Sequence, residues 1–168
     1  MRIRSLFYAF LAFQIIIALE GPTDAILYEL LPFSQFAVLS IALGALYEEA
    51  IKYWFYKRLD PKEGFIMAWL VTIGEAILWG PFGFFSRIIF PFHVLLFLIM
   101  FGLGFDKLSL AFCLSFHVCH NILAQAINLH LFWGFPLFPF YELNDAILFL
   151  WGAYYGWRKR EEILAWFR

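Results

Sequence analysis

The chain has 168 residues, of which 64% are hydrophobic and 23% aromatic, while only 15% are charged. Soluble domains are nearer about 45–50% apolar and about 25% charged, so this composition excludes an ordinary soluble protein and indicates that lipid solvates much of the surface. The net charge of −1 indicates no particular partner. No basic face or nucleic-acid motif is present, so we expect no nucleic-acid partner.

Six apolar segments follow one another along the chain, each long enough to cross about 30 Å of hydrocarbon. We expect them at about 3–19, 33–56, 64–84, 88–105, 108–129 and 143–157. Residues 20–24 are expected to break the first segment, and 130–141 to form a loop or re-entrant turn. The tail 158–168 predicts a short amphipathic helix on the membrane surface. The fold class is therefore all-α: one polytopic transmembrane bundle of about six spans over residues 1–168.

The positive charges test this number of spans. With six spans, almost all lysines and arginines at the ends of the segments or between them fall on one side of the membrane: Arg2, Arg4, Lys57, Arg58, Lys62, Lys107, Arg158, Lys159, Arg160 and Arg168. The opposite loops hold only Arg87. Because positive charges favour the cytoplasmic side, we expect an integral, multi-pass protein of the cell membrane with both termini in the cytoplasm.

Ionisable and polar side chains interrupt four of the apolar segments: Glu48, Glu49, Lys52, Glu75, His93, His117, His120 and Asn121. Each ionisable group raises the free energy of membrane insertion by roughly 2.5–3.5 kcal/mol within a span, so we expect each to have a structural or functional role. Counted at about 1.5 Å per residue from one side, four of these groups lie roughly 14–20 Å deep: Glu48, Glu75, His93 and His117. Groups at one depth must face one another or a water-filled cavity, so the sequence predicts a polar site shared by four helices.

Spacing within the helices adds detail. Glu48 and Lys52 are four residues apart and can pair on one face, and His117 and Asn121 share the same spacing. Two adjacent carboxylates, Glu48 and Glu49, suit acid–base catalysis because they cannot both ionise freely in a low dielectric. Glutamate with histidine can also hold a divalent metal, or activate water without one. A neutralised structural pair and interhelical hydrogen bonds are the alternative interpretations of single members.

Four short motifs, in this order, resemble those of the PrsW family of intramembrane proteases. They are EEAIK at 48–52, Gly-Glu-Ala at 74–76, RIIFPFH at 87–93 and HVCHN at 117–121. The resemblance covers about residues 40–125. PrsW proteins are similar to the wider CPBP group, which includes the CAAX prenyl endopeptidases. That group has Glu-Glu-x-x-x-Arg as its first motif, whereas Tyr53 takes the arginine position here, so PrsW is the closer match.

The resemblance implies a role for each site residue. The general base would be Glu48 or Glu49, His93 would be a water or metal partner, and the oxyanion side would be His117 with Asn121. The supporting residues would be Lys52, Glu75, Arg87 and His120. A divalent metal such as zinc, if present, would be held by Glu48, His93 and His117. Both metal-dependent and metal-free glutamate mechanisms are described for the family, and the sequence leaves this choice open.

We therefore expect an intramembrane endopeptidase that cleaves a membrane-anchored protein or peptide within the lipid bilayer. Two alternatives remain open. The superfamily resembles the non-catalytic scaffold subunit of gamma-secretase, so the chain could be a scaffold that binds a partner helix. A small proton- or ion-coupled transporter would also place glutamate and histidine inside the membrane.

Overall fold

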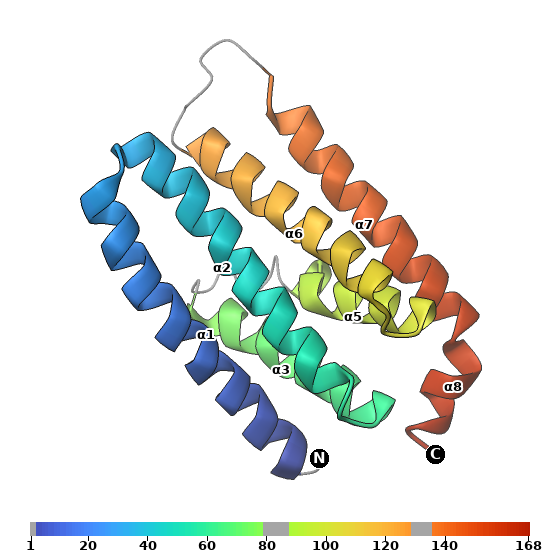
Figure 1. Cartoon of the computed structure of the whole chain (residues 1–168). Coiled ribbons are helices and arrows are strands. Elements are labelled where there is room, and N and C mark those ends of the chain that lie inside the picture. Colours follow the sequence, from blue (N-terminus) through green and yellow to red (C-terminus); the bar gives the residue numbers. More distant parts are fainter. Residues whose placement is uncertain (1–2, 79–87, 129–135) are drawn as a thin grey trace.

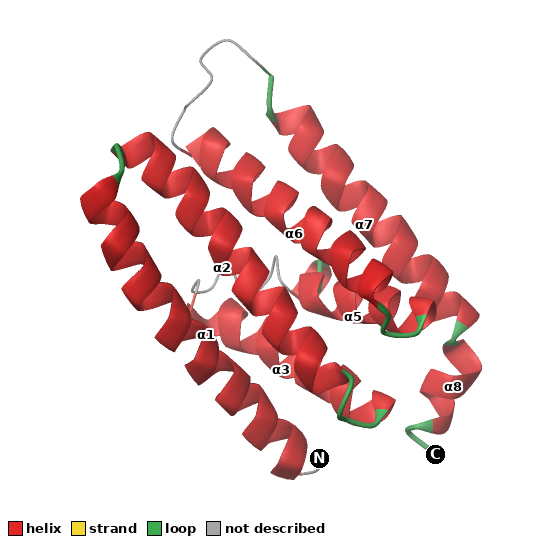
Figure 2. Cartoon of the chain, in the orientation of Figure 1, coloured by secondary structure: helices red, strands yellow, loops and turns green. Residues whose placement is uncertain are grey.

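The computed structural model describes residues 3–78, 88–128 and 136–168, and within these ranges the regular structure is entirely helical (Figures 1 and 2). The helices are α1 (Ile3–Leu30), α2 (Phe33–Tyr56), α3 (Pro61–Leu78), α5 (Phe92–Leu103), α6 (Lys107–Asn128), α7 (Phe138–Arg158) and α8 (Arg160–Ala165). The all-α prediction is confirmed. The predicted second segment coincides with α2, and the short helix expected in the tail is α8.

The expected break at 20–24 is wrong, because α1 continues to Leu30 with Pro22 inside it. A proline removes one backbone donor from a helix, and neighbouring threonine hydroxyls commonly re-satisfy the backbone at such points. Here the Thr23 hydroxyl donates at 2.7 Å to the Leu19 carbonyl, the neighbour of the Ala18 carbonyl that loses its usual partner at Pro22. The chain turns instead just before Pro32, since the residue preceding a proline avoids the helical region. Residues 20–24 therefore lie on a helix that packs against α2.

The loop expected at 130–141 is wrong in its last part, because α7 begins at Phe138. Pro139 lies in the first turn of α7, where the missing N–H has no helical acceptor to lose. The rest of that predicted loop up to residue 135 lies outside the described residues, as do residues 79–87 at the predicted end of the third segment. The third helix itself begins at Pro61, three residues before the predicted start.

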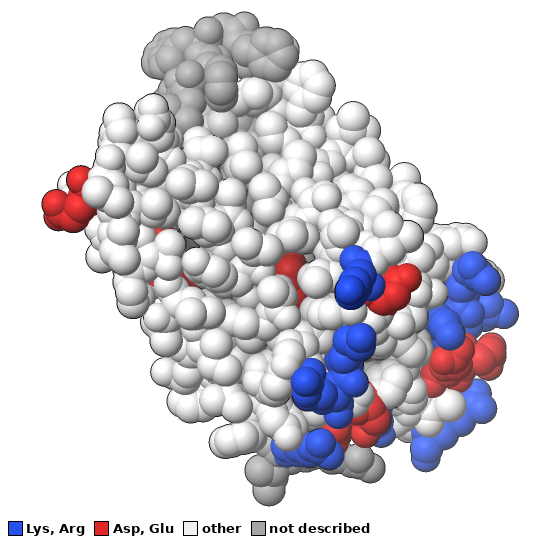
Figure 3. All heavy atoms as spheres, viewed as in Figure 1, with Lys and Arg blue, Asp and Glu red and all other residues white. Residues whose placement is uncertain are grey.

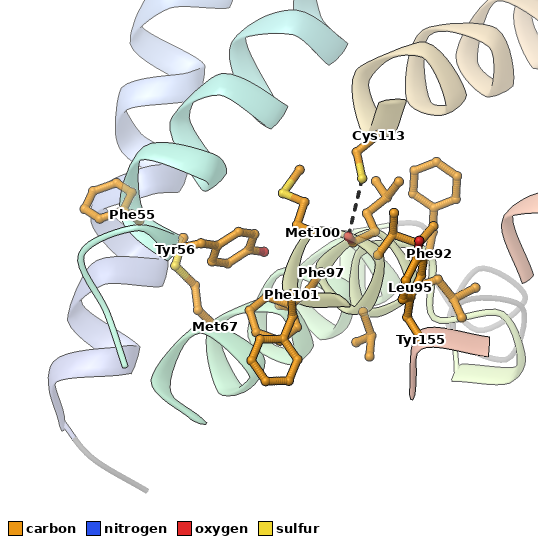
Figure 4. Close-up of a cluster of buried hydrophobic side chains, with 14 of the residues drawn as sticks. Phe55, Tyr56, Met67, Phe92, Leu95, Phe97, Met100, Phe101, Cys113 and Tyr155 are labelled. Atoms are coloured by element: carbon orange, nitrogen blue, oxygen red, sulfur yellow. Dashed lines mark hydrogen bonds between the residues drawn. The ribbon is translucent and has the colours of Figure 1, made fainter. Parts of the chain in front are cut away.

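Apart from α8, the helices form a closed ring of neighbours in the order α1, α2, α6, α7, α5 and α3 (Figure 1). The shortest of them, α5, lies in the middle of the core, and most of its side chains from Phe92 to Phe101 are buried. Figure 4 shows Phe97, Phe101 and Met100 of this helix among side chains from α2, α3, α6 and α7. The first turn of α5, which carries His93, is therefore buried inside the bundle.

Two helices, Arg4–Leu30 and Lys107–Ile127, are long and apolar enough to cross a membrane. Phe92–Leu103 is apolar but has 12 residues, fewer than the fourth segment predicted at 88–105. Large apolar side chains are exposed on the outward faces of α1 and α7, among them Phe7, Phe10, Leu150 and Trp157. Soluble monomers rarely expose so much contiguous apolar surface. These features indicate membrane association.

Charged side chains gather at one end of the bundle (Figure 3). Figure 1 places at this end the start of α1, the end of α2 and the start of α3, together with the start of α6 and the junction of α7 with α8. Lysines and arginines occupy these helix ends: Arg4, Lys57, Arg58, Lys62, Lys107, Arg158, Lys159 and Arg160. Among the described residues, Lys52 is the lysine that lies deep within a helix and is buried.

The crossing of α5 and α7 requires a residue without a side chain at position 152. A Cβ atom added to Gly152 would lie 3.1 Å from the Leu95 Cα and 2.6 Å from its Cδ2. We expect Gly152→Ala to destabilise the protein by about 1–3 kcal/mol, because relief requires a shift of the helix backbone. Denaturation in detergent micelles measures this loss. Gly21→Ala is the matched control, since nothing lies within 4 Å of the added atom, and equal stability of both variants would contradict the packing argument.

Candidate functional site

The polar residues predicted from sequence meet around one cavity, where α2, α3, α5 and α6 come together. The cavity has a volume of about 150 Å³, enough for several water molecules. It is lined by Glu48, Glu75, Phe92, His93, His117, His120 and Asn121. The structure therefore brings six of the predicted polar side chains together at one cavity, and Phe92 joins them as a residue that the sequence analysis did not name. Arg87 lies outside the described residues.

Lys52 is the centre of this arrangement. Its ammonium nitrogen lies 2.9 Å from Glu48 Oε1, 2.6 Å from Glu49 Oε1 and 2.7 Å from His93 Nδ1, and its side chain is 1% exposed. An ammonium group has three donors and no acceptor. These three contacts therefore use its full hydrogen-bonding capacity, and a cation buried this deeply is stable because two carboxylates share it.

The Lys52 contact determines the protonation of the His93 ring. Since the ammonium can only donate, His93 Nδ1 must accept, and the proton of a neutral imidazole then lies on Nε2. That nitrogen lies 2.7 Å from Glu75 Oε1, but the oxygen is off the direction of the ring N–H, so the pair is a close polar contact and not an aligned hydrogen bond. His93 thus presents a buried N–H donor beside the cavity.

Glu49 contacts the ring of His117 on the side away from the cavity. Its Oε1 accepts from His117 Nδ1 at 2.7 Å as well as from Lys52, and its side chain is 1% exposed. A carboxylate on one ring nitrogen orients the imidazole and leaves the other nitrogen as an acceptor. His117 Nε2 lies 3.5 Å from Glu48 Oε2. Glu49 is therefore buried away from the cavity, whereas His117 lines it.

Glu48 is the carboxylate of the adjacent pair that faces the cavity, and its side chain is 15% exposed. One oxygen pairs with Lys52, and the other approaches His117 Nε2. Two acceptors 3.5 Å apart attract each other only through a shared proton or a donor placed between them. A water molecule that donates to both needs acceptors about 4.4 Å apart, so the two side chains would separate by about 1 Å to admit it.

The residues do not fit a metal well. Glu48, Glu75 and His93 offer ligand atoms that all lie within 4.8 Å of one another, so Glu75 takes the place that we predicted for His117 in the metal-ligand set. A metal needs the lone pair of His93 Nε2, yet this nitrogen carries the proton while Nδ1 accepts from Lys52. Binding a metal there would require breaking the buried lysine contact.

Two carboxylates near the cavity were missed in the sequence analysis. Asp145 of α7 accepts from His120 Nδ1 at 2.7 Å and from Asn144 Nδ2 at 3.3 Å. It lies within the predicted sixth span, so the rule that found Glu75 also applies to it. Glu20 of α1 was assigned to the expected break, but its carboxylate lies against Gly44, one turn before Glu48 on α2.

No family model, curated protein or solved structure matches this chain significantly. The resemblance to PrsW proteases therefore rests on the four motifs and stays a prediction.

Removal of the buried Lys52 ammonium should lower the free energy of unfolding. We expect Lys52→Met to destabilise the fold by about 3–5 kcal/mol, because two carboxylates lose their shared partner in a low dielectric. Unfolding by sodium dodecyl sulfate in mixed micelles measures the change.

Lys57→Met is the matched control, an exposed lysine five residues further on in the chain, expected to change stability by less than about 0.5 kcal/mol. Adding Glu49→Gln to Lys52→Met should recover part of the loss, since it removes one of the two unpaired charges. A Lys52→Met protein as stable as the control would show that the cation does not hold the site together.

Proposed function

We propose that this protein is an intramembrane endopeptidase that hydrolyses a peptide bond in a membrane-anchored protein or peptide. The observation that carries the proposal is the pairing of a cavity-facing glutamate, Glu48, with a histidine whose ring is oriented by a second glutamate, Glu49. This arrangement of base, acceptor and orienting carboxylate is the one that water activation needs. The order of the motifs resembling PrsW points to the same reaction.

We also propose how the bundle lies in the membrane. Six segments would cross the bilayer, five of them as the helices α1, α2, α3, α6 and α7, and both termini would lie in the cytoplasm. The sixth crossing would be made by the stretch that contains α5, whose 12 helical residues cover only about 18 Å of it. The gathering of basic residues at one end of the bundle supports this orientation (Figure 3). The cavity then lies within the hydrocarbon layer, where it can receive a substrate segment from the membrane.

In the proposed reaction, water donates one hydrogen bond to Glu48 Oε2 and one to His117 Nε2. Glu48 removes a proton as the water oxygen attacks the substrate carbonyl carbon, and the carbonyl electron pair moves to its oxygen. Donors must then stabilise the oxyanion, and His93 Nε2–H and the Asn121 amide both border the cavity. These assignments place His117 on the water side and His93 on the oxyanion side, the reverse of the roles implied by the resemblance.

The two glutamates should differ in their effect on cleavage. We expect Glu48→Gln to lower the cleavage rate of a membrane-anchored fluorogenic peptide by about 10³-fold or more, because it removes the base. Glu49→Gln should lower it by about 10–100-fold, since His117 keeps a hydrogen-bonding neighbour but loses the orienting charge.

The exposed Glu29→Gln on α1 is the control and should retain the normal rate. Purified protein reconstituted in liposomes provides the measurement. Full cleavage by Glu48→Gln would refute the protease proposal. A purified wild-type protein that cleaves nothing and retains a partner helix would identify the scaffold alternative.

The proposed reaction proceeds without a metal, because the proton on His93 Nε2 uses the lone pair that a metal would need. Treatment with 1,10-phenanthroline or EDTA should therefore change the rate by less than about twofold, while a zinc protease assayed in parallel loses its activity. A loss of activity in this protein that added Zn²⁺ restores would show that the metal-dependent mechanism is the correct one.

A further inference from the structure

A second carboxylate–imidazole pair borders the same cavity. His120 Nδ1 lies 2.7 Å from Asp145 Oδ1, and the Asn144 amide also donates to that oxygen at 3.3 Å. The His120 side chain is 7% exposed and Asp145 19%. Because Nδ1 is held by Asp145, Nε2 is the ring nitrogen left for a ligand in the cavity that His120 lines.

The two histidines of α6, His117 and His120, line the same cavity. His117 and His120 are three residues apart, so they project from the same side of the helix. Phe92 lies between them, with its ring centroid 5.0 Å from that of His117 and 4.6 Å from that of His120. A ligand that fills this cavity therefore contacts both histidines.

The two carboxylate–imidazole pairs, Glu49 with His117 and Asp145 with His120, differ in how much negative charge the carboxylate offers to the histidine. Glu49 already shares its negative charge with Lys52, so little is left to stabilise an imidazolium at His117. Asp145 pairs with no lysine or arginine among the described residues, and its charge is available to His120. The aromatic rings of Phe92 and Tyr141, 4.6 and 4.9 Å from His120, also favour a cation there. His117 therefore suits the acceptor role, and His120 the role of a proton donor.

Resting on the proposed hydrolysis, we propose that His120 is the catalytic acid that protonates the leaving nitrogen, and that Asp145 is its positioning residue. When the tetrahedral intermediate collapses, the carbonyl re-forms and the C–N bond breaks. The bond's electron pair stays on nitrogen, which takes the proton from His120 Nε2. The proton that Glu48 removed from water returns through solvent to His120. The products are a carboxylic acid and an amine, so atoms and charge balance.

The test compares two leaving groups in the full-length protein reconstituted in liposomes. One probe is a palmitoylated peptide with an internal alkyl amide bond, and the other carries a 4-nitrophenyl ester at the same carbonyl. An amine must be protonated to leave, whereas 4-nitrophenolate leaves without a proton. His120→Gln should therefore lower the ratio of amide to ester cleavage by about 10²-fold, and Asp145→Asn by about tenfold. Because both rates come from one preparation, the ratio does not depend on the fraction of folded protein.

Glu142→Gln is the matched control, since it removes an exposed acid from the same helix, and its ratio should equal that of the wild type. Glu48→Gln should lose both activities. If Glu48→Gln is inactive while His120→Gln keeps the wild-type ratio, this inference is wrong and the proposed function stands. If Glu48→Gln cleaves both probes normally, or the wild type cleaves neither, the proposed function falls and this inference with it.

Discussion

The site depends on one buried cation. Lys52 on α2 binds two carboxylates of its own helix and the His93 ring of α5, and Glu49 extends the connection to His117 of α6. A charge in such surroundings cannot be left alone, so its partners must adopt the geometry that satisfies it. This requirement sets the proton position on His93, keeps Glu49 bound to Lys52 and His117, and leaves Glu48 as the member of the adjacent glutamate pair that faces the cavity.

The same constraint separates residues that are neighbours in sequence. Glu48 and Glu49 are adjacent, but one step along a helix rotates a side chain by about 100°. Glu48 is 15% exposed and borders the cavity, whereas Glu49 is 1% exposed between Lys52 and His117. Two identical side chains thereby receive different chemistry, one suited to a base and the other to holding an imidazole in place.

Most of the helical arrangement could be predicted because apolar segments and charged ends follow simple periodicity and length rules. The errors at 20–24 and 138–141 came from prolines, and α5 covers only Phe92–Leu103 of the fourth segment predicted at 88–105. Pro22 lies inside α1, where Thr23 bonds to the Leu19 carbonyl, and Pro139 lies in the first turn of α7. A proline disturbs a helix only through the donor it lacks and the clash it causes, and both depend on its place in the turn.

The sequence by itself determined which polar side chains of four helices meet at one cavity, because the rise per residue converts a position in the chain into a level along each helix. It also determined the spacing that lets Lys52 reach Glu48. Only the tertiary structure decided which side of each helix meets which neighbour. The proton on His93, the burial of Glu49 and the pairing of His120 with Asp145 all depend on contacts between helices far apart in the chain. Such contacts arise from packing, which no local pattern encodes.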